Sequence, residues 1–171
     1  MLFRSATEQR RPRRPVLFTV LMVLLALAGT AAGGTTWRVE QLSQREAASA
    51  AALEAVRERL PELLSYRFAT LEEDLEEALA QTTGDFTAEY GALIDEVVRT
   101  TATQRRIITE ASVNGAGVVA VESHEEVLVL VFLTQSTTSR SSSDPATSGS
   151  RVEVTMRQEG SDWLIAGLRT R

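Results

Sequence analysis

The chain has 171 residues, a net charge of −5 and no cysteine. Without cysteine it has neither a disulfide framework, nor a thiolate zinc site, nor a cysteine nucleophile. The charge is uneven, because residues 1–36 are basic and the remainder is acidic. An acidic soluble part argues against nucleic-acid binding, since contacts to phosphates need clustered Lys or Arg.

An uncharged apolar run, residues 16–34, follows a cluster of four arginines within residues 10–14. As a helix, the run would span about 28 Å, close to the roughly 30 Å hydrocarbon thickness of a bilayer. The positive-inside rule keeps the arginines in the cytoplasm. The sequence therefore predicts a plasma-membrane protein with a cytoplasmic basic tail at 1–14 and a single transmembrane helix at 15–36. A cleaved signal peptide, with Ala26-Leu27-Ala28 as its cleavage pattern, is the alternative, and it too places the C-terminal domain outside the cytoplasm.

Residues 37–60 are rich in Ala, Glu, Gln, Arg and Leu, which favours a helical stalk. The apolar spacing of Leu53, Val56, Leu60 and Leu63 covers fewer than two heptads, so the apolar face of a first domain helix is preferred over a coiled coil. Pro61 lacks a backbone N–H and predicts a kink or a restart of the helix. An extracytoplasmic domain is expected over residues 61–171.

Two further helices are expected. Thr70 and Glu73 fit a capping box at the start of the next helix, and Leu71, Leu75, Ala78 and Leu79 form one apolar stripe. Asp74 and the neighbouring glutamates are expected on its solvated faces. Gly84 and Asp85 predict the end of this helix and the cap of a third, which runs to about Thr103. The expected buried stripe of the third helix is Phe86, Tyr90, Leu93, Ile94, Val97 and Val98.

The remainder of the chain predicts strands. Residues 105–121 are rich in β-branched residues and interrupted at 114–117, which indicates either a hairpin turn or a bulge in one long bent strand. The apolar run 127–133 predicts a central strand buried on both faces, and the Ser/Thr-rich stretch 134–150 predicts a long mobile loop. Strict alternation over 151–157 predicts a half-buried strand that could pair at a sheet edge. A turn at 159–162 leads to the last strand, 163–168.

The predicted fold class is therefore α+β: the transmembrane helix and stalk, then about three helices on a curved antiparallel sheet of about four strands. The sequence offers few catalytic candidates. His124 is the single histidine and lies in a polar turn, where an exposed residue is the simpler interpretation than a metal ligand or a triad member. A carboxylate or tyrosine inside an apolar cavity is the remaining enzymatic route, with Tyr66, Asp74, Asp95 and Glu110 as its candidates. No catalytic, cofactor-binding or metal-binding residue is assigned and no cofactor is expected.

A resemblance to a known family rests on three segments. The first is L-L-x-Y-x-F-x-T-L-x-x-D-L followed by T-T-G-x-F-x-x-x-Y, which here comprises Leu63, Leu64, Tyr66, Phe68, Thr70, Leu71, Asp74 and Leu75, then Thr82, Thr83, Gly84, Phe86 and Tyr90. The others are residues 127–138 and 162–168. Together they resemble the Mce-associated membrane proteins of actinobacteria over roughly residues 40–170. Arg67 departs from the pattern, because many relatives have an acid there.

That resemblance implies a cystatin-like cone of the nuclear transport factor 2 type, which type IV secretion assembly factors also use. It implies a non-enzymatic accessory protein that stabilises or assembles an Mce-type lipid or sterol import complex, with the membrane, the subunits of that complex and lipid as partners. Three alternatives stay open: a lipid- or steroid-binding module, a SnoaL-like or ketosteroid-isomerase-like enzyme, and a secretion-system assembly factor.

Overall fold

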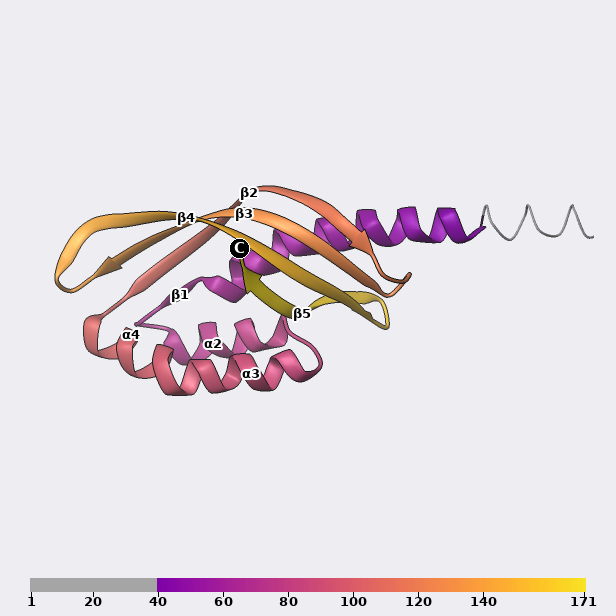
Figure 1. Cartoon of the computed structure of the whole chain (residues 1–171). Coiled ribbons are helices and arrows are strands. Elements are labelled where there is room, and N and C mark those ends of the chain that lie inside the picture. Colours follow the sequence, from indigo (N-terminus) through magenta and orange to yellow (C-terminus); the bar gives the residue numbers. More distant parts are fainter. Residues whose placement is uncertain (1–39) are drawn as a thin grey trace, which may run out of the picture. The chain divides into compact units, whose positions relative to one another are not determined.

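The computed structural model describes residues 40–171 (Figure 1). The expected basic tail at 1–14, the expected transmembrane helix at 15–36 and the first three residues of the stalk lie outside the described residues. Within the described part, no helix combines the length and the apolar character needed to cross a membrane.

The first helix covers residues 40–64 and continues through Pro61 without interruption, so the predicted restart at this residue is wrong. Pro61 lies in the last turn, between Leu60 and Leu63, which are both buried in the core. This packing holds the turn in place although Pro61 donates no hydrogen bond. The core already begins at Ala48, so most of the segment expected to be a stalk belongs to the folded unit.

The sheet is antiparallel, and its five strands follow one another in chain order. This confirms the α+β class with a sheet, and adds one short strand to the number expected. The fourth strand lies between the third and the fifth, so the predicted edge pairing by residues 151–157 is wrong. The strands are β1 (Tyr66–Arg67), β2 (Ile108–Val121), β3 (Glu126–Ser139), β4 (Ser142–Glu159) and β5 (Asp162–Thr170).

One face of the sheet forms the core with the first helix. Alternate residues of β3 and β4 are buried there, as the alternation over 151–157 predicted. The other face of β3 is less covered: Phe132 is 49% exposed, so the predicted burial of 127–133 on both faces is wrong. Figure 1 shows the reason, since α2, α3 and α4 lie on the same side of the sheet. The core residues include Val56, Leu60 and Leu63, with Val127, Val129, Val131, Val152, Val154, Met156 and Ile165.

Residues 134–150 form a long β-hairpin, which contradicts the predicted mobile loop. Its Thr-rich ladder pairs Thr134 with Gly149 and Thr137 with Ala146, in keeping with the preference of threonine for strands. Pro145 falls within the register shift after Thr137, where a strand tolerates a residue that lacks an N–H. At the hairpin tip the Arg140 N–H donates to the Arg105 carbonyl, 2.8 Å away.

β2 is one continuous strand with two bulges. Its register with β3 shifts once between Val113 and Gly115, at Asn114, and again between Val118 and Ala120, at Val119. The bulge alternative for residues 105–121 is therefore confirmed and the hairpin alternative is wrong. The Asn114 amide donates to the Thr134 hydroxyl at 2.7 Å, which fixes the extra residue of the first bulge against β3.

α2 (Leu71–Ala80) buries Leu71, Leu75 and Ala78 of its predicted stripe. The third helix is less regular, since an i→i+5 segment, η1 (Ile94–Val98), separates α3 (Asp85–Leu93) from α4 (Arg99–Arg105). Gly84 is the N-cap of α3 and Asp85 is the first residue of this helix, so the predicted cap at Asp85 is wrong by one position.

The buried face of the third helix differs from the predicted stripe, because Leu93 and Val97 are about half exposed. The residues that face the cores recur every four positions. In a regular α-helix, residues with this spacing drift by about 40° at each step around the helix axis. The wider turn of the i→i+5 segment offsets this drift and keeps them on the buried face. This inward series is Phe86, Tyr90, Ile94, Val98 and Ala102.

Candidate functional site

A pocket of about 580 Å³ lies where the end of the first helix meets β1, α2 and β2. Three of the four sequence candidates lie in its wall: Tyr66, Asp74 and Glu110. The fourth, Asp95, lies elsewhere and pairs with Arg99 at 3.2 Å. The other lining residues are Glu62, Ser65, Arg67, Glu77, Ala80, Gln81 and Thr109.

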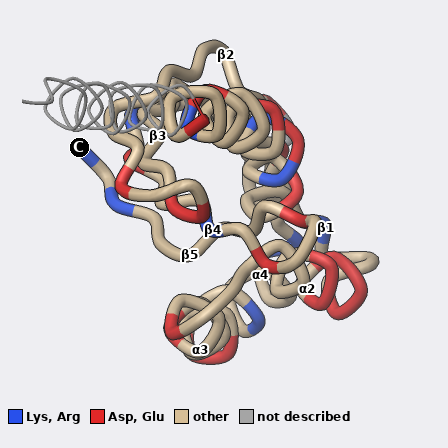
Figure 2. Tube along the Cα trace, turned by 90° about the vertical axis from the view of Figure 1, so that its right-hand side faces the viewer, with Lys and Arg blue, Asp and Glu red and all other residues tan. Residues whose placement is uncertain are grey.

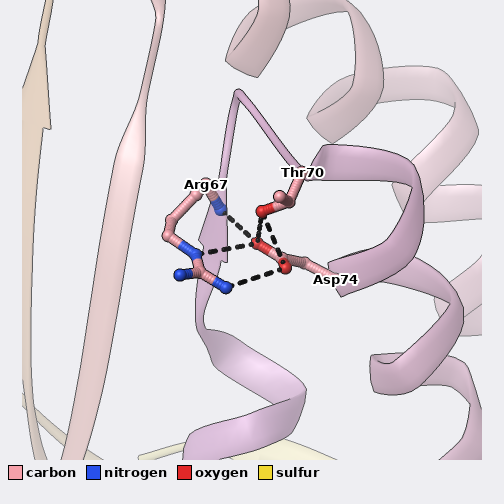
Figure 3. A network of polar contacts seen from close by, with 3 residues as sticks. All are labelled: Arg67, Thr70 and Asp74. Atoms are coloured by element: carbon pink, nitrogen blue, oxygen red, sulfur yellow. Dashed lines mark hydrogen bonds and ion pairs between the residues drawn. The ribbon is translucent and has the colours of Figure 1, made fainter.

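A polar network connects β1 to the first turn of α2 in the pocket wall (Figure 3). The Arg67 backbone N–H donates to Asp74 Oδ2 at 2.7 Å, and its guanidinium donates to the same carboxylate through Nε at 3.4 Å and Nη2 at 3.3 Å. The Thr70 hydroxyl donates to both carboxylate oxygens, at 3.0 and 3.1 Å. Asp74 is only 8% exposed, so the prediction that it lies on a solvated face is wrong.

The electrostatics of Asp74 oppose a role as a proton acceptor near neutral pH. Burial by itself would raise the pKa of Asp74, but the hydrogen bonds from Arg67 and Thr70 and the charge of Arg67 outweigh it and bring the pKa below its ordinary value of 3.8. The same hydrogen bond and charge raise the pKa of Arg67. A general base of the isomerase type needs a raised carboxyl pKa, and this carboxylate has the opposite shift.

The network also corrects the expected capping box. Thr70 is the N-cap of α2, but its side chain caps no backbone N–H, because its hydroxyl is directed to Asp74. The Thr and Asp of the L-L-x-Y-x-F-x-T-L-x-x-D-L motif are therefore the two residues that close the β1–α2 turn. Their spacing of four residues brings both to the same side of the first turn.

The remaining polar residues of the pocket could not be grouped from the sequence, because they come from separate elements. The Ser65 hydroxyl accepts a hydrogen bond from the Ala111 N–H at 2.9 Å. Gln81 accepts from Arg59 at 2.6 Å. Figure 2 shows acidic residues gathered along α2, and with Arg67 as the single basic lining residue the pocket is acidic.

Neither the pocket nor the rest of the described chain contains a group of three or more side chains arranged to hold a metal ion. His124 lies in the exposed β2–β3 turn, with Nε2 3.3 Å from a Glu125 carboxylate oxygen. The pocket wall holds one ionised carboxylate, that of Asp74, in place between β1 and α2.

Solved structures with a similar fold include a type IV secretion system protein. An IcmL-like type IV secretion system protein from Legionella pneumophila has a TM-score of 0.59 at 7% identity, covering 70% of this chain and 88% of that one. The periplasmic domain of DotI has a TM-score of 0.60 at 12% identity, covering 71% of this chain and 94% of that one. Identities this low show the fold alone. They confirm the expectation that the chain shares its fold with type IV secretion components.

The similarity in sequence extends over most of the chain. Two proteins of Mycobacterium tuberculosis are each 34% identical to it: "Uncharacterized protein Rv1362c", over 85% of this chain and 67% of that protein, and "Outer membrane protein Rv1973", over 83% of this chain and 88% of that protein. A family model described as "Uncharacterized protein Rv1363c/MT1408-like" matches residues 15–167. The chain therefore belongs to the Rv1363c/MT1408-like family.

Proposed function

We propose that the protein is a non-enzymatic accessory subunit of the cell envelope that stabilises or assembles an Mce-type lipid or sterol import complex. In this proposal a single N-terminal helix anchors it in the plasma membrane and the described domain acts outside the cytoplasm. The observation that carries the proposal is the packing of the first helix against one face of the sheet, which leaves the outer surface of the domain for contacts with partners.

The first helix packs on the face of the sheet where a ligand-binding cone would be hollow. The first helix places Val56, Leu60 and Leu63 against the sheet, and each is at most 1% exposed. Every buried side-chain nitrogen and oxygen in the described part has a hydrogen-bond partner. Ligand pockets are concave and mostly apolar, with a few convergent polar groups. The packed interior therefore disfavours the lipid- or steroid-binding module.

The isomerase-like enzyme is disfavoured by the state of Asp74. A carboxylate that two neighbouring residues stabilise in its ionised form is a poor proton acceptor at neutral pH. Its pocket is also open to solvent and lined by carboxylates, which differs from the apolar site that raises a carboxyl pKa.

Support for an Mce complex comes from the resemblance of the motifs around Tyr66, Thr70 and Asp74 to those of Mce-associated membrane proteins. The name of the Rv1973 relative, an outer membrane protein, supports an envelope location. A secretion-system assembly factor is the second candidate, because the likeness in fold to the IcmL-like protein and to DotI favours it. In either role the protein would be a subunit of a larger complex in the cell envelope.

The test is a pull-down of the tagged full-length protein from its native membranes in mild detergent, with proteins and lipids identified by mass spectrometry. Recovery of Mce transporter subunits is the expected result. Recovery of secretion components in their place would favour the second candidate, and recovery of lipid with no transporter subunit would overturn the accessory role.

Two matched surface variants locate the contact. Phe132 and Leu93 are each 49% exposed, the first on the outer face of the sheet and the second on α3. We expect Phe132→Glu or Leu93→Glu, but not both, to remove the partner while the domain stays folded, because exposed positions tolerate charge. Loss of partners with neither variant would place the contact elsewhere on the domain.

A further inference from the structure

The edge of the sheet at β2 is open along most of its length. β1 pairs only with Ile108 and Thr109, and the last edge amide with a partner is that of Ala111, which donates to Ser65. Over residues 112–121 no backbone hydrogen bond in the described chain goes to anything but β3. Residues 111–121 also contain no charge. An edge without charge or proline is a template for pairing with another strand.

The register shows which backbone groups of this edge point outward. In an antiparallel pair, alternate residues direct their N–H and C=O groups to the neighbouring strand and away from it. The Ala111 N–H points away from β3, whereas that of Glu122 points to the β3 side and donates to Glu126. This alternation runs from Ala111 to Glu122, with one extra residue at each bulge. Between them, four residues direct their backbone groups outward: Val113, Ala116, Val118 and Val121.

This outward set is symmetric about Gly117, since its members lie three, two and three residues apart. We propose that β2 pairs with β2 of a second copy of this chain, antiparallel, with a two-fold axis at Gly117. In this register Val113 faces Val121 and Ala116 faces Val118, so each outward N–H and C=O meets a partner. A surface that meets itself across a two-fold axis is an isologous interface.

Charge at the ends of the edge supports the same register. With the axis at Gly117, Glu110 of one copy lies opposite His124 of the other. With the axis at Ala116, Glu110 would face Glu122, and like charges directly opposite are destabilising. The axis at Ala116 would also bring outward Val113 against Val119, the extra residue of the second bulge.

The centre of the proposed interface is accessible. Val118 and Val119 are 36% and 54% exposed, and a Cβ added at Gly115 or Gly117 would meet nothing within 4 Å.

The absence of cysteine makes disulfide trapping a direct test. Gly117 would face its own copy in a non-hydrogen-bonded pair, with Cα atoms about 4.5 Å apart, inside the range that a disulfide bridges. We expect Gly117→Cys in the full-length protein, oxidised in native membranes, to give a disulfide-linked homodimer.

Gly115→Cys is the matched control, on the same strand and also in open space. The two copies of position 115 would lie about 13 Å apart along the strands. We therefore expect at least about tenfold less dimer for this variant, because a disulfide cannot span that distance. Adding Val118→Pro to Gly117→Cys should abolish the dimer, since it removes an outward N–H that the ladder with β3 does not use.

Three results would overturn the proposal. The first is a Gly117→Cys protein that reacts with a maleimide but forms no dimer. The second is equal dimer formation by the Gly115→Cys variant, which would indicate random collision. The third is a disulfide from residue 117 to a different protein, which would assign the edge to a partner strand. Circular dichroism of the Val118→Pro variant checks that its sheet is intact.

Discussion

The Tyr90 hydroxyl donates a hydrogen bond to the Leu63 carbonyl oxygen, 2.6 Å away. The bond joins the third helix to the last turn of the first helix, next to Pro61. Tyr90 contacts both core clusters and stacks on Phe86, with the ring centroids 5.7 Å apart. One side chain therefore connects the two halves of the core.

Replacing Tyr90 with Phe should lower the free energy of unfolding by about 1–2 kcal/mol, because the Leu63 carbonyl loses its donor. Burial, and secondarily Tyr66, raise the pKa of Tyr90 from 10.0 to about 12. The folded state therefore keeps a proton that the unfolded state loses above pH 10. This contribution is fully present below pH 10 and is lost as the pH rises through 12.

Urea unfolding of the parent and of Tyr90→Phe at pH 7, 9, 10 and 11 measures both effects. The difference between the two proteins should shrink across the alkaline points. A difference that stays constant to pH 11 would show that Tyr90 does not carry the alkaline loss of stability.

Asp74→Asn should lower the free energy of unfolding by about 2 kcal/mol at pH 7, because hydrogen bonds to a buried charged acceptor are among the stronger ones. The pKa of Asp74 is lowered in the folded state. Its contribution is therefore present above the unfolded pKa of 3.8 and is lost as the pH falls through the lower folded value.

The controls for Asp74 come from its neighbours. Glu73→Gln changes an exposed carboxylate one residue away and should leave the stability almost unchanged. Arg67→Ala should cost less than Asp74→Asn, because its backbone N–H still donates to the carboxylate at 2.7 Å. Denaturant midpoints at pH 7 and pH 3 measure all three variants, and an Asp74→Asn protein as stable as the parent would contradict the role of the network.

The i→i+5 segment predicts that two of its apolar residues, Ile94 and Val97, contribute differently to the free energy of unfolding. Ile94 is 1% exposed, and Ile94→Ala should cost about 2–4 kcal/mol by leaving a cavity. Val97→Ala should change the stability by less than about 0.5 kcal/mol, because Val97 is half exposed. Thermal unfolding of both variants measures the difference. Similar losses would indicate that Val97 is buried, as a regular helical stripe would have it.

Two glycines should respond in opposite directions to alanine. Gly84 has φ +63°, and an added Cβ would lie 3.0 Å from Arg157 Nη1, so Gly84→Ala should destabilise by about 1–3 kcal/mol. Gly91 lies inside α3, and its Cβ would make an ordinary contact with Leu79 at 3.7 Å. Gly91→Ala should stabilise by about 0.5–1 kcal/mol. Chemical denaturation measures both, and two changes of the same sign would contradict this assignment.

The sequence predicted those elements whose side chains repeat with a single period. Alternation over 151–157 identified the buried face of β4, and the stripe of α2 identified Leu71, Leu75 and Ala78. The prediction failed where the period changes within one element. Leu93, directly before the i→i+5 segment, and Val97, within it, are about half exposed. The hairpin over 134–150 differs from the predicted loop because Ser and Pro145 are typical of loops, whereas Thr also favours strands.

The candidate site was predictable only as a set of isolated residues. Tyr66, Asp74 and Glu110 were singled out by residue type, and the fold brings all three into one pocket. The burial of Asp74 could not be predicted, because its neighbours in the sequence are glutamates that face solvent. Its partners depend on the path of the β1–α2 turn, which a helical period does not describe.

The position of the first helix has a consequence for the order of folding. Its apolar face packs against core residues of β3, β4 and β5, from Val127 to Ile165. The Ile165 carbonyl also accepts a hydrogen bond from the Thr83 N–H, in the segment after α2. These contacts join distant parts of the chain, and such topologies fold slowly. Of the described helices, the one that is synthesised first is thus among the last to be buried, and its apolar face stays open to non-native contacts until β5 has been synthesised.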